Sequence, residues 1–351
     1  MRPPSLPHIL IVGAGPVGLY CALGLAKSGA RVGVIDNGAR GAGWASGGML
    51  GATYETCGRD DVPRALIDLA FDSAQQWVFM RRHLGLQAVC ETIFVARNDG
   101  EAQFLSRMAL TQPVTPIAIP TGLNAQAAWR CDTDCAIDPR AALVALHSAC
   151  IDEGVSFLQG DVKSVQPYSI VMVDGTTLKA DAIVIATGQG CSSLSASLPE
   201  LANITPVKGQ LMSLARDPGQ PFKQVIRAGR LYLVPRGETI VIGATSADGD
   251  DDATTIDVIE QDGLYREALE LYPALSGLAQ VESWAGLRPM TPDGLPMVGW
   301  SSLEGVALAC GTYRNGWLLA PAIGKHIAGL IIHDDFDAAI LQPFSPQRFP
   351  I

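Results

Sequence analysis

Three glycines near the start of the chain have the spacing of a phosphate-binding turn. In GAGPVG, Gly13, Gly15 and Gly18 lie between an apolar run and an amphipathic stretch. The first glycine of such a turn permits a tight bend, the second lets the backbone approach a pyrophosphate, and the third lets helix and strand pack closely. The helix N-terminus that follows attracts phosphate groups. The segment therefore predicts a dinucleotide site.

An acidic residue supports this prediction. Asp36 lies 21 residues after Gly15, at the end of a second apolar run, ARVGVID. A carboxylate there can accept both hydroxyls of an adenosine ribose and would repel a 2′-phosphate. An ordinary glycine-rich turn gives no reason for the acid. The two features together predict bound FAD or NAD and leave the choice between them open.

A lone arginine in the C-terminal third predicts an anion site. Arg288 lies in WAGLRPMTPDG and has no acidic neighbour until Asp293. A buried, unpaired guanidinium is costly, so this one should find an anion. Its planar fork suits a carboxylate held by two hydrogen bonds. The partner could be a bound ligand, or a distant Asp or Glu in a structural ion pair.

The segment GTYRNG (311–316) precedes a long apolar stretch that predicts a helix. Asn315 is a candidate N-cap, and Gly316 permits close approach of a ligand to the backbone. A positive helix end beside a flavin ring would stabilise its anionic reduced form. A capped core helix after a buried strand is the alternative. Ser/His/Asp and Cys/His arrangements for nucleophilic catalysis are missing from the sequence.

The elements that must position these residues follow from the apolar patterns. Strand, helix and strand over 8–36 form a βαβ unit. Asp60 can cap the next helix, with Pro63 in its first turn. Further helices are expected at 60–84, 138–154 and 257–271, and a final helix should reach about residue 332. Two further buried strands are expected at 180–187 and 306–311. Segments at 210–216, 224–237 and 239–245 predict an antiparallel sheet, and the acidic run 248–252 a solvated loop.

These elements predict an α/β and α+β fold of two discontinuous domains. A Rossmann-like cofactor domain with a mostly parallel sheet would comprise 1–80, 135–205 and 285–351. A substrate domain built on an antiparallel sheet would comprise 81–134 and 206–284.

Composition narrows the class of protein. Of the 351 residues 48% are apolar, and 25 basic against 35 acidic residues give a net charge of −10, which argues against nucleic acid or an anionic membrane as a partner. The best apolar stretch, 316–332, contains Lys325 and His326, and MRPPSLPH lacks the apolar core of a signal peptide. We expect a cytoplasmic protein without a membrane span. The eight cysteines and five histidines show no metal-site spacing, so we expect free thiols and no metal.

Several segments, in order, resemble the flavin-dependent D-amino-acid and glycine oxidase family, and within it the glycine oxidases of the thiazole pathway. The resemblance covers residues 9–332 and is carried by the following segments: ASGGMLGATYETCGRD (45–60), CAIDPRAALVALHSAC (135–150), DAIVIATGQG (181–190), PVKGQ (206–210), YLVPRGETIVIGAT (232–245), WAGLRPMTPDGLPMVG (284–299) and GTYRNGWLLAPAIGKHIAGLI (311–331).

The resemblance implies FAD as the cofactor. The residues expected to hold it are Gly13, Gly15, Pro16, Val17, Gly18, Asp36, Asn37, Gly43, Gly47, Gly48, Met49, Val162, Gly188, Tyr313, Arg314, Asn315, Gly316, Trp317 and Leu318. Relatives with covalent flavin carry a Cys where this chain has Gly286 and Leu287, so noncovalent FAD is expected.

The resemblance also implies a reaction. Arg288 would bind the carboxylate of a small amino acid or amine substrate, Tyr232 would share this task, and Arg314 would help position the substrate. Tyr232 could otherwise be a strand aromatic of the core. Hydride would pass from the substrate Cα to flavin N5, the imine would hydrolyse to a 2-oxo acid and ammonia, and oxygen would be reduced to hydrogen peroxide. Thiamine biosynthesis and a homo-oligomer are further expectations of this kind.

The chain departs from the family pattern in two places. The residues Ala42, Gly43 and Trp44 replace the usual Ser or Thr of the loop before Gly-Met-Leu, and Met290 and Trp317 replace smaller residues. If Met290 or Trp317 faces the pocket, the preferred substrate would differ from glycine. Two other functions stay open: a D-amino-acid dehydrogenase that uses an acceptor other than oxygen, and a non-catalytic FAD-binding redox sensor or subunit. A sensor has no evident use for a carboxylate clamp.

Overall fold

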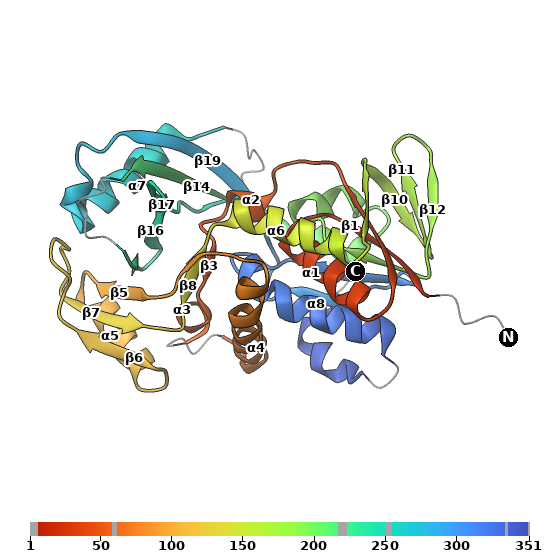
Figure 1. Cartoon of the computed structure of the whole chain (residues 1–351), viewed down its shortest axis with the longest axis horizontal. Coiled ribbons are helices and arrows are strands. Elements are labelled where there is room, and N and C mark those ends of the chain that lie inside the picture. Colours follow the sequence, from red (N-terminus) through yellow and green to blue (C-terminus); the bar gives the residue numbers. More distant parts are fainter. Residues whose placement is uncertain (1–5, 58–61, 217–222, 250–254, 334–335, 350–351) are drawn as a thin grey trace.

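The computed structural model describes residues 6–57, 62–216, 223–249, 255–333 and 336–349. Two lobes lie side by side, one built on a mostly parallel sheet and the other on a mostly antiparallel sheet (Figure 1). Both sheet types agree with the predicted fold class.

The parallel-sheet lobe begins with the predicted βαβ unit, formed by β1 (His8–Val12), α1 (Pro16–Lys27) and β2 (Arg31–Asp36). The apolar run of β1 is buried because the sheet is covered on both faces, as parallel sheets are. The strand order is β20-β21-β13-β1-β2-β9, and only β20 runs antiparallel to its neighbour. The remaining strands are β9 (Ser156–Gln159), β13 (Ala182–Ile185), β20 (Met297–Trp300) and β21 (Val306–Cys310).

Three further helices complete this lobe: α4 (Arg64–His83), α6 (Pro139–Asp152) and α8 (Gly316–Ile332). Helices α1 and α8 pack closely because Gly24 faces Gly324 across the contact. Asp138 caps α6 by accepting the backbone N–H of Arg140. Pro63 stands at the N-cap of α4 rather than in its first turn, and the predicted cap Asp60 lies outside the described residues.

The antiparallel-sheet lobe has nine strands in the order β18-β14-β17-β16-β15-β5-β7-β6, with β19 also paired to β14. Only β5 and β15 run parallel to each other. The strands are β5 (Thr92–Ala96), β6 (Val114–Ile117), β7 (Ala127–Cys131), β14 (Thr205–Ala215), β15 (Val225–Ala228), β16 (Leu231–Arg236), β17 (Thr239–Gly243), β18 (Ala247–Asp248) and β19 (Gln280–Met290).

Two helices, α5 (Asp99–Ala109) and α7 (Val258–Leu271), belong to the same lobe. Strand β19 pairs with β14 along its length and runs across the predicted domain boundary between residues 284 and 285. The division into domains stays a prediction. Residues 250–252 of the predicted acidic loop lie outside the described residues.

Two three-stranded sheets and several short helices complete the described structure. One sheet has the order β3-β8-β4 and the other β10-β11-β12. Their strands are β3 (Met49–Leu50), β4 (Ala88–Val89), β8 (Cys135–Ile137), β10 (Val162–Gln166), β11 (Ser169–Met172) and β12 (Thr177–Lys179). The short helices are α2 (Ala42–Ala45), α3 (Ala52–Thr56), η1 (Gly188–Leu194), η2 (Pro199–Asn203), η3 (Pro273–Leu275), η4 (Ala338–Phe344) and η5 (Pro346–Arg348).

In the part of the chain that the structure describes, every helix is too short or too polar to cross a membrane.

Candidate active site

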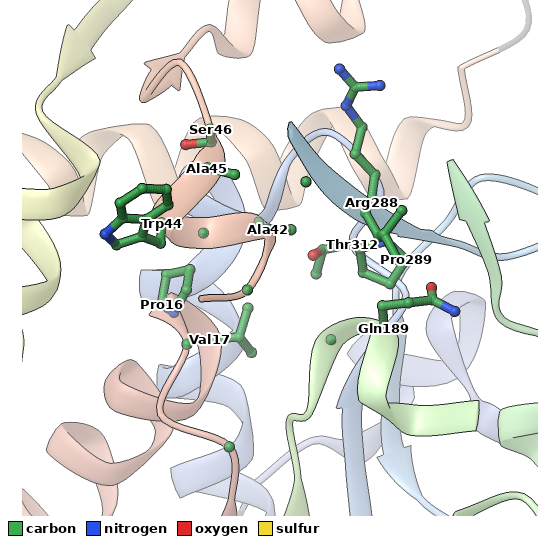
Figure 2. A pocket seen from close by; sticks show the side chains of 18 of the residues that line it. Pro16, Val17, Ala42, Trp44, Ala45, Ser46, Gln189, Arg288, Pro289 and Thr312 are labelled. Carbon is green, nitrogen blue, oxygen red and sulfur yellow. The ribbon is translucent and has the colours of Figure 1, made fainter. Parts of the chain in front are cut away.

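A cavity of about 540 Å³ is lined by residues of both lobes. The turn after β1 and the segment from β2 to β3 line it from one lobe, and β14, β16 and β19 from the other. Figure 2 shows Pro16 and Val17 on one side of the cavity and the guanidinium of Arg288 on the other. The cavity therefore has a phosphate-binding end at the βαβ turn and a second, arginine-bearing end.

The glycines of the βαβ turn shape the first end. Gly13 has a φ of +106°, which favours glycine, and a Cβ on Gly18 would collide with the carbonyl oxygen of Gly13. A Cβ on Gly15 would meet nothing within 4 Å, and Gly15 lines the cavity as the N-cap of α1. The helix N-terminus thus opens onto empty space through a residue without a side chain. This geometry fits a pyrophosphate.

Asp36 lies at the same end, and its carboxylate is held by the backbone. It accepts hydrogen bonds from the N–H groups of Ala14 and Gly38, both at 2.7 Å. A carboxylate has about four acceptor sites, so two stay available for ribose hydroxyls. The neighbouring Asn37 is oriented by Asp161, to which it donates a hydrogen bond at 2.8 Å.

The loop that departs from the family pattern packs against α8. Gly43 is pressed against the ring of Pro16, and its carbonyl oxygen accepts a hydrogen bond from Trp317 Nε1 at 2.8 Å. Trp44 stacks beneath the guanidinium of Arg140, 3.8 Å from the ring centroid. In Figure 2 the indole of Trp44 points away from Arg288. Trp317 therefore braces this loop, in addition to lining the cavity.

The start of α8 differs from prediction in one detail. Asn315 occupies the N-cap position, but its side chain makes no capping hydrogen bond. Its backbone (φ −104°, ψ 15°) is not the extended conformation from which a cap side chain reaches the first-turn N–H groups. Gly316 lines the cavity directly after it, and Tyr313 has a φ of +47°, a strained conformation for a residue with a side chain.

Tyr232 lies at the arginine-bearing end in a slot made by two glycines. Its side chain is 8% exposed, and a Cβ on either Gly47 or Gly243 would overlap the phenol. Burial raises the pKa of Tyr232, so the phenol keeps its proton at neutral pH.

Arg288 crosses over Gly209, where any Cβ would overlap its guanidinium. Within the described structure its hydrogen bonds go to two carbonyl groups, those of Lys208 at 3.4 Å and Thr245 at 3.1 Å. Burial lowers its pKa. Among the described residues no carboxylate forms an ion pair with Arg288, so the alternative of a structural ion pair is not what the fold provides. The half-buried cation thus has room for an anionic ligand.

The sequence analysis did not predict the ion pair at the same end of the cavity, between Arg227 and Glu55. Arg227 is 2% exposed, forms an ion pair with Glu55 and lies over the ring of Tyr54. Arg314 lies 3.6 Å from the same carboxylate, and Glu55 is the main cause that raises the pKa of Arg314. A charged residue inside the apolar strand run QVIRAGRLYLV was the signal that could have identified Arg227.

Most of the predicted site residues line this one cavity. The exceptions are Gly18, Asn315 and Leu318, which lie outside the lining. Met290, one of the two larger residues noted above, also lies outside the lining, whereas Trp317 is part of it. The lining includes Gln189, whose buried Oε1 has no hydrogen-bond partner within the described structure. The individual roles of these residues stay predictions.

Among the described residues, no cluster of three or more His, Cys, Asp or Glu side chains is arranged to hold a metal ion.

The chain is similar to known oxidoreductases over most of its length. The family model for FAD dependent oxidoreductases (DAO) matches residues 8–330. Glycine oxidase of Geobacillus kaustophilus is 31% identical, over 97% of this chain and 96% of that protein. Its crystal structure superposes with a TM-score of 0.85, at 28% identity, over 98% of this chain and 100% of that one. The bifunctional protein ThiO/ThiG of Synechocystis is 30% identical over 97% of this chain, which spans about half (54%) of that longer protein.

Proposed function

Because the chain belongs to the FAD-dependent oxidoreductase family, FAD is its cofactor, and we propose that it oxidises glycine or another small amino acid or amine with oxygen. The overall reaction would convert the amino acid, water and oxygen to a 2-oxo acid, ammonia and hydrogen peroxide. One observation carries the proposal: Arg288, half-buried and without a carboxylate partner among the described residues, faces a cavity that also holds a dinucleotide-binding turn.

The cavity suits FAD along its length. Gly15 and the α1 N-terminus would receive the pyrophosphate, and Asp36 the adenosine ribose. Gly316 and Trp317, at the start of α8, would lie at the flavin edge, where the unfilled first-turn N–H groups of the helix favour negative charge. FAD supplies the electron-accepting chemistry when bound.

Arg288 and Tyr232 would hold the substrate. The guanidinium offers a fork for a carboxylate, and the buried phenol, protonated at neutral pH, donates one further hydrogen bond. Gly47, Gly243 and Gly209 leave the space that these two side chains occupy. Glu55 would fix Arg314 and balance part of the positive charge at this end.

The lining provides no evident general base. Within the described part of the chain it contains no His or Lys, and its carboxylate at this end, Glu55, is engaged by Arg227. The substrate amine would therefore have to arrive neutral, and the residues would act by positioning and electrostatics. We expect the rate of substrate oxidation to rise with pH until the amine of the substrate is deprotonated.

A role in thiamine biosynthesis is supported by the ThiO/ThiG relatives and is part of this proposal. The chain's similarity to glycine oxidases also supports glycine as the first substrate to test.

The test is the visible absorption spectrum of the purified protein without oxygen, before and after glycine is added. We expect an oxidised-flavin spectrum that glycine bleaches and that oxygen restores, with one hydrogen peroxide per substrate. Arg288→Ala should retain the flavin spectrum and resist bleaching at the same glycine concentration. If glycine, N-methylated amino acids and D-amino acids all leave the spectrum unchanged, the proposed substrate class is wrong. If glycine bleaches the flavin and oxygen does not restore its spectrum, the electron acceptor of the enzyme is a compound other than oxygen.

A further inference from the structure

Two cysteines far apart in the sequence face each other at the edge of a small sheet. In the antiparallel pair β4–β8, Val89 is opposite Ala136, and the next step of the same register places Cys90 opposite Cys135. Both are free and half-buried, and the Cys135 thiol donates a long hydrogen bond, of 3.8 Å, to the Thr133 carbonyl. Residues directly opposite in an antiparallel pair have Cβ atoms about 4.5–5.5 Å apart, close to the separation that a disulfide needs.

An arginine completes this arrangement. Arg81, in the last turn of α4, donates a hydrogen bond to the Cys90 sulfur. The adjacent Cys135 thiol and the nearby Arg81 charge lower the pKa of Cys90 to about 6, although burial opposes them. The adjacent Cys90 sulfur and burial raise the pKa of Cys135. At neutral pH the pair therefore consists of one thiolate and one thiol, the two forms that oxidation to a disulfide requires.

We propose that Cys90 and Cys135 are a peroxide-oxidisable dithiol that closes to an intramolecular disulfide. The Cys90 thiolate attacks hydrogen peroxide: an S–O bond forms, the O–O bond breaks, and hydroxide leaves and takes up a proton. The Cys135 sulfur then attacks the sulfenic acid of Cys90, so that the S–S bond forms and a second water leaves. The two thiols lose two electrons, and peroxide is reduced to water.

The pair lies next to the wall of the cavity. Strand β8 is the central strand of its sheet, and β3, on its other side, carries Met49 of the cavity lining. Leu50 of β3 is opposite Cys135 itself. Hydrogen peroxide made in the cavity would have a short path to this pair. This internal source of peroxide rests on the proposed function, but the reaction of the two cysteines does not, because added peroxide drives it as well.

A second cysteine pair offers a control within the same molecule. The sulfurs of Cys191 and Cys310 lie 3.1 Å apart, and both residues are fully buried. The neighbours of these sulfurs are uncharged groups, namely the Thr187 hydroxyl and the Ile185 carbonyl. This pair has the proximity but lacks both the access and the adjacent cation.

The experiment uses the reduced, FAD-containing protein without substrate. Hydrogen peroxide is added at pH 7 and at pH 8, free thiols are blocked at intervals, and peptides are identified by mass spectrometry. We expect a Cys90–Cys135 disulfide to form before any oxidation of Cys191 or Cys310. Its rate should change less than about twofold between the two pH values, whereas a thiol of ordinary pKa should react about eightfold faster at pH 8.

Variants separate the parts of the pair. Cys135→Ser should leave Cys90 as a sulfenic acid that dimedone traps, and Cys90→Ser should leave Cys135 reduced. Arg81→Gln should slow disulfide formation at pH 7 by about threefold or more, and the rate should then rise with pH as it does for an ordinary thiol. The same substitution at the neighbouring, exposed Arg82 should have neither effect. The proposal is overturned if Cys90 reacts no faster than the buried cysteines, or if it is oxidised without bonding to Cys135. Because no turnover is involved, a failure here is distinct from a failure of the proposed reaction.

Discussion

The two ends of the cavity are built by different means. The phosphate-binding end comes from one contiguous segment plus Asp36, and it presents backbone N–H groups and empty space. The arginine-bearing end is assembled from six segments, and it presents buried side chains. Its ion pairs depend on Glu55, which meets both Arg227 and Arg314.

The two ends should therefore respond differently to substitutions. A substitution cannot remove the backbone N–H groups of the first end, but it can add side-chain atoms that fill the space in front of them. The second end is sensitive to atoms removed, because a buried charge without its partner is costly. Arg288 is the exception in the second end: no carboxylate of the described residues pairs with it, and a bound carboxylate would supply that partner.

The largest effect should come from removing that cation. We expect Arg288→Ala to raise the KM for the amino acid by about 30-fold to several thousand-fold, equivalent to about 2–5 kcal/mol for a desolvated charge pair. The measurement is steady-state oxidation at varied substrate concentration, together with the FAD content of the variant.

Arg97 offers a matched control, because it is a half-buried arginine of the same lobe that pairs with Glu101 and Glu267 outside the cavity. Arg97→Ala should leave the KM unchanged within about twofold, with any effect confined to stability. An Arg288→Ala enzyme with a wild-type KM would show that the carboxylate is held elsewhere.

The next effect should separate two glycines of the same turn. Gly18→Ala puts a Cβ onto the Gly13 carbonyl, so the backbone must shift, and we expect the free energy of unfolding to fall by about 1–3 kcal/mol. Gly15→Ala fills only the cavity, so we expect unchanged stability of the FAD-free protein and about tenfold or weaker FAD binding. Thermal unfolding and flavin titration measure the two quantities. Equal effects of both substitutions on both quantities would contradict this view of the turn.

A smaller effect should come from adding an atom at the second end. Gly209→Ala places a Cβ against the guanidinium of Arg288, the mobile end of a long side chain, so the fold can adapt while the clamp moves. We expect about a tenfold higher KM, or about 1.4 kcal/mol, with an unchanged melting temperature. Loss of stability without a change in KM would mean that the strand, rather than the clamp, absorbs the added methyl group.

The sequence predicted the first end of the cavity well, because its residues are contiguous or follow a known spacing. The βαβ unit, helix α6 and the antiparallel strands were likewise predicted from apolar periodicity and turn residues, whereas the Asp138 cap of α6 was not. FAD was indicated by the ordered segments shared with the family and is confirmed by the family match.

The second end was only partly predictable. Arg288 was predicted as an anion site from its own segment, and the family resemblance added Tyr232 and the carboxylate role. Glu55 and Arg227 lie far apart in the sequence and meet only in the tertiary structure, where they form an ion pair. No periodicity marks strands as short as β4 and β8, so the pairing of Cys90 with Cys135 depends on tertiary structure. Asn315 shows the limit of local rules, because its position was right and its capping bond was not.

The smallest effect should come from the phenol beside the clamp. Tyr232→Phe keeps the ring that fills the slot between Gly47 and Gly243 and removes one hydrogen-bond donor. We expect a KM about 2- to 10-fold higher, equivalent to about 0.5–1.5 kcal/mol, with unchanged FAD content. Because burial raises the pKa of Tyr232, the wild-type phenol stays protonated up to and beyond the ordinary value near 10, so the ratio of variant to wild-type KM should be constant from pH 7 to pH 9. A ratio that falls across this range would mean that the phenol ionises there, and that Tyr232 acts as a charge rather than as a donor.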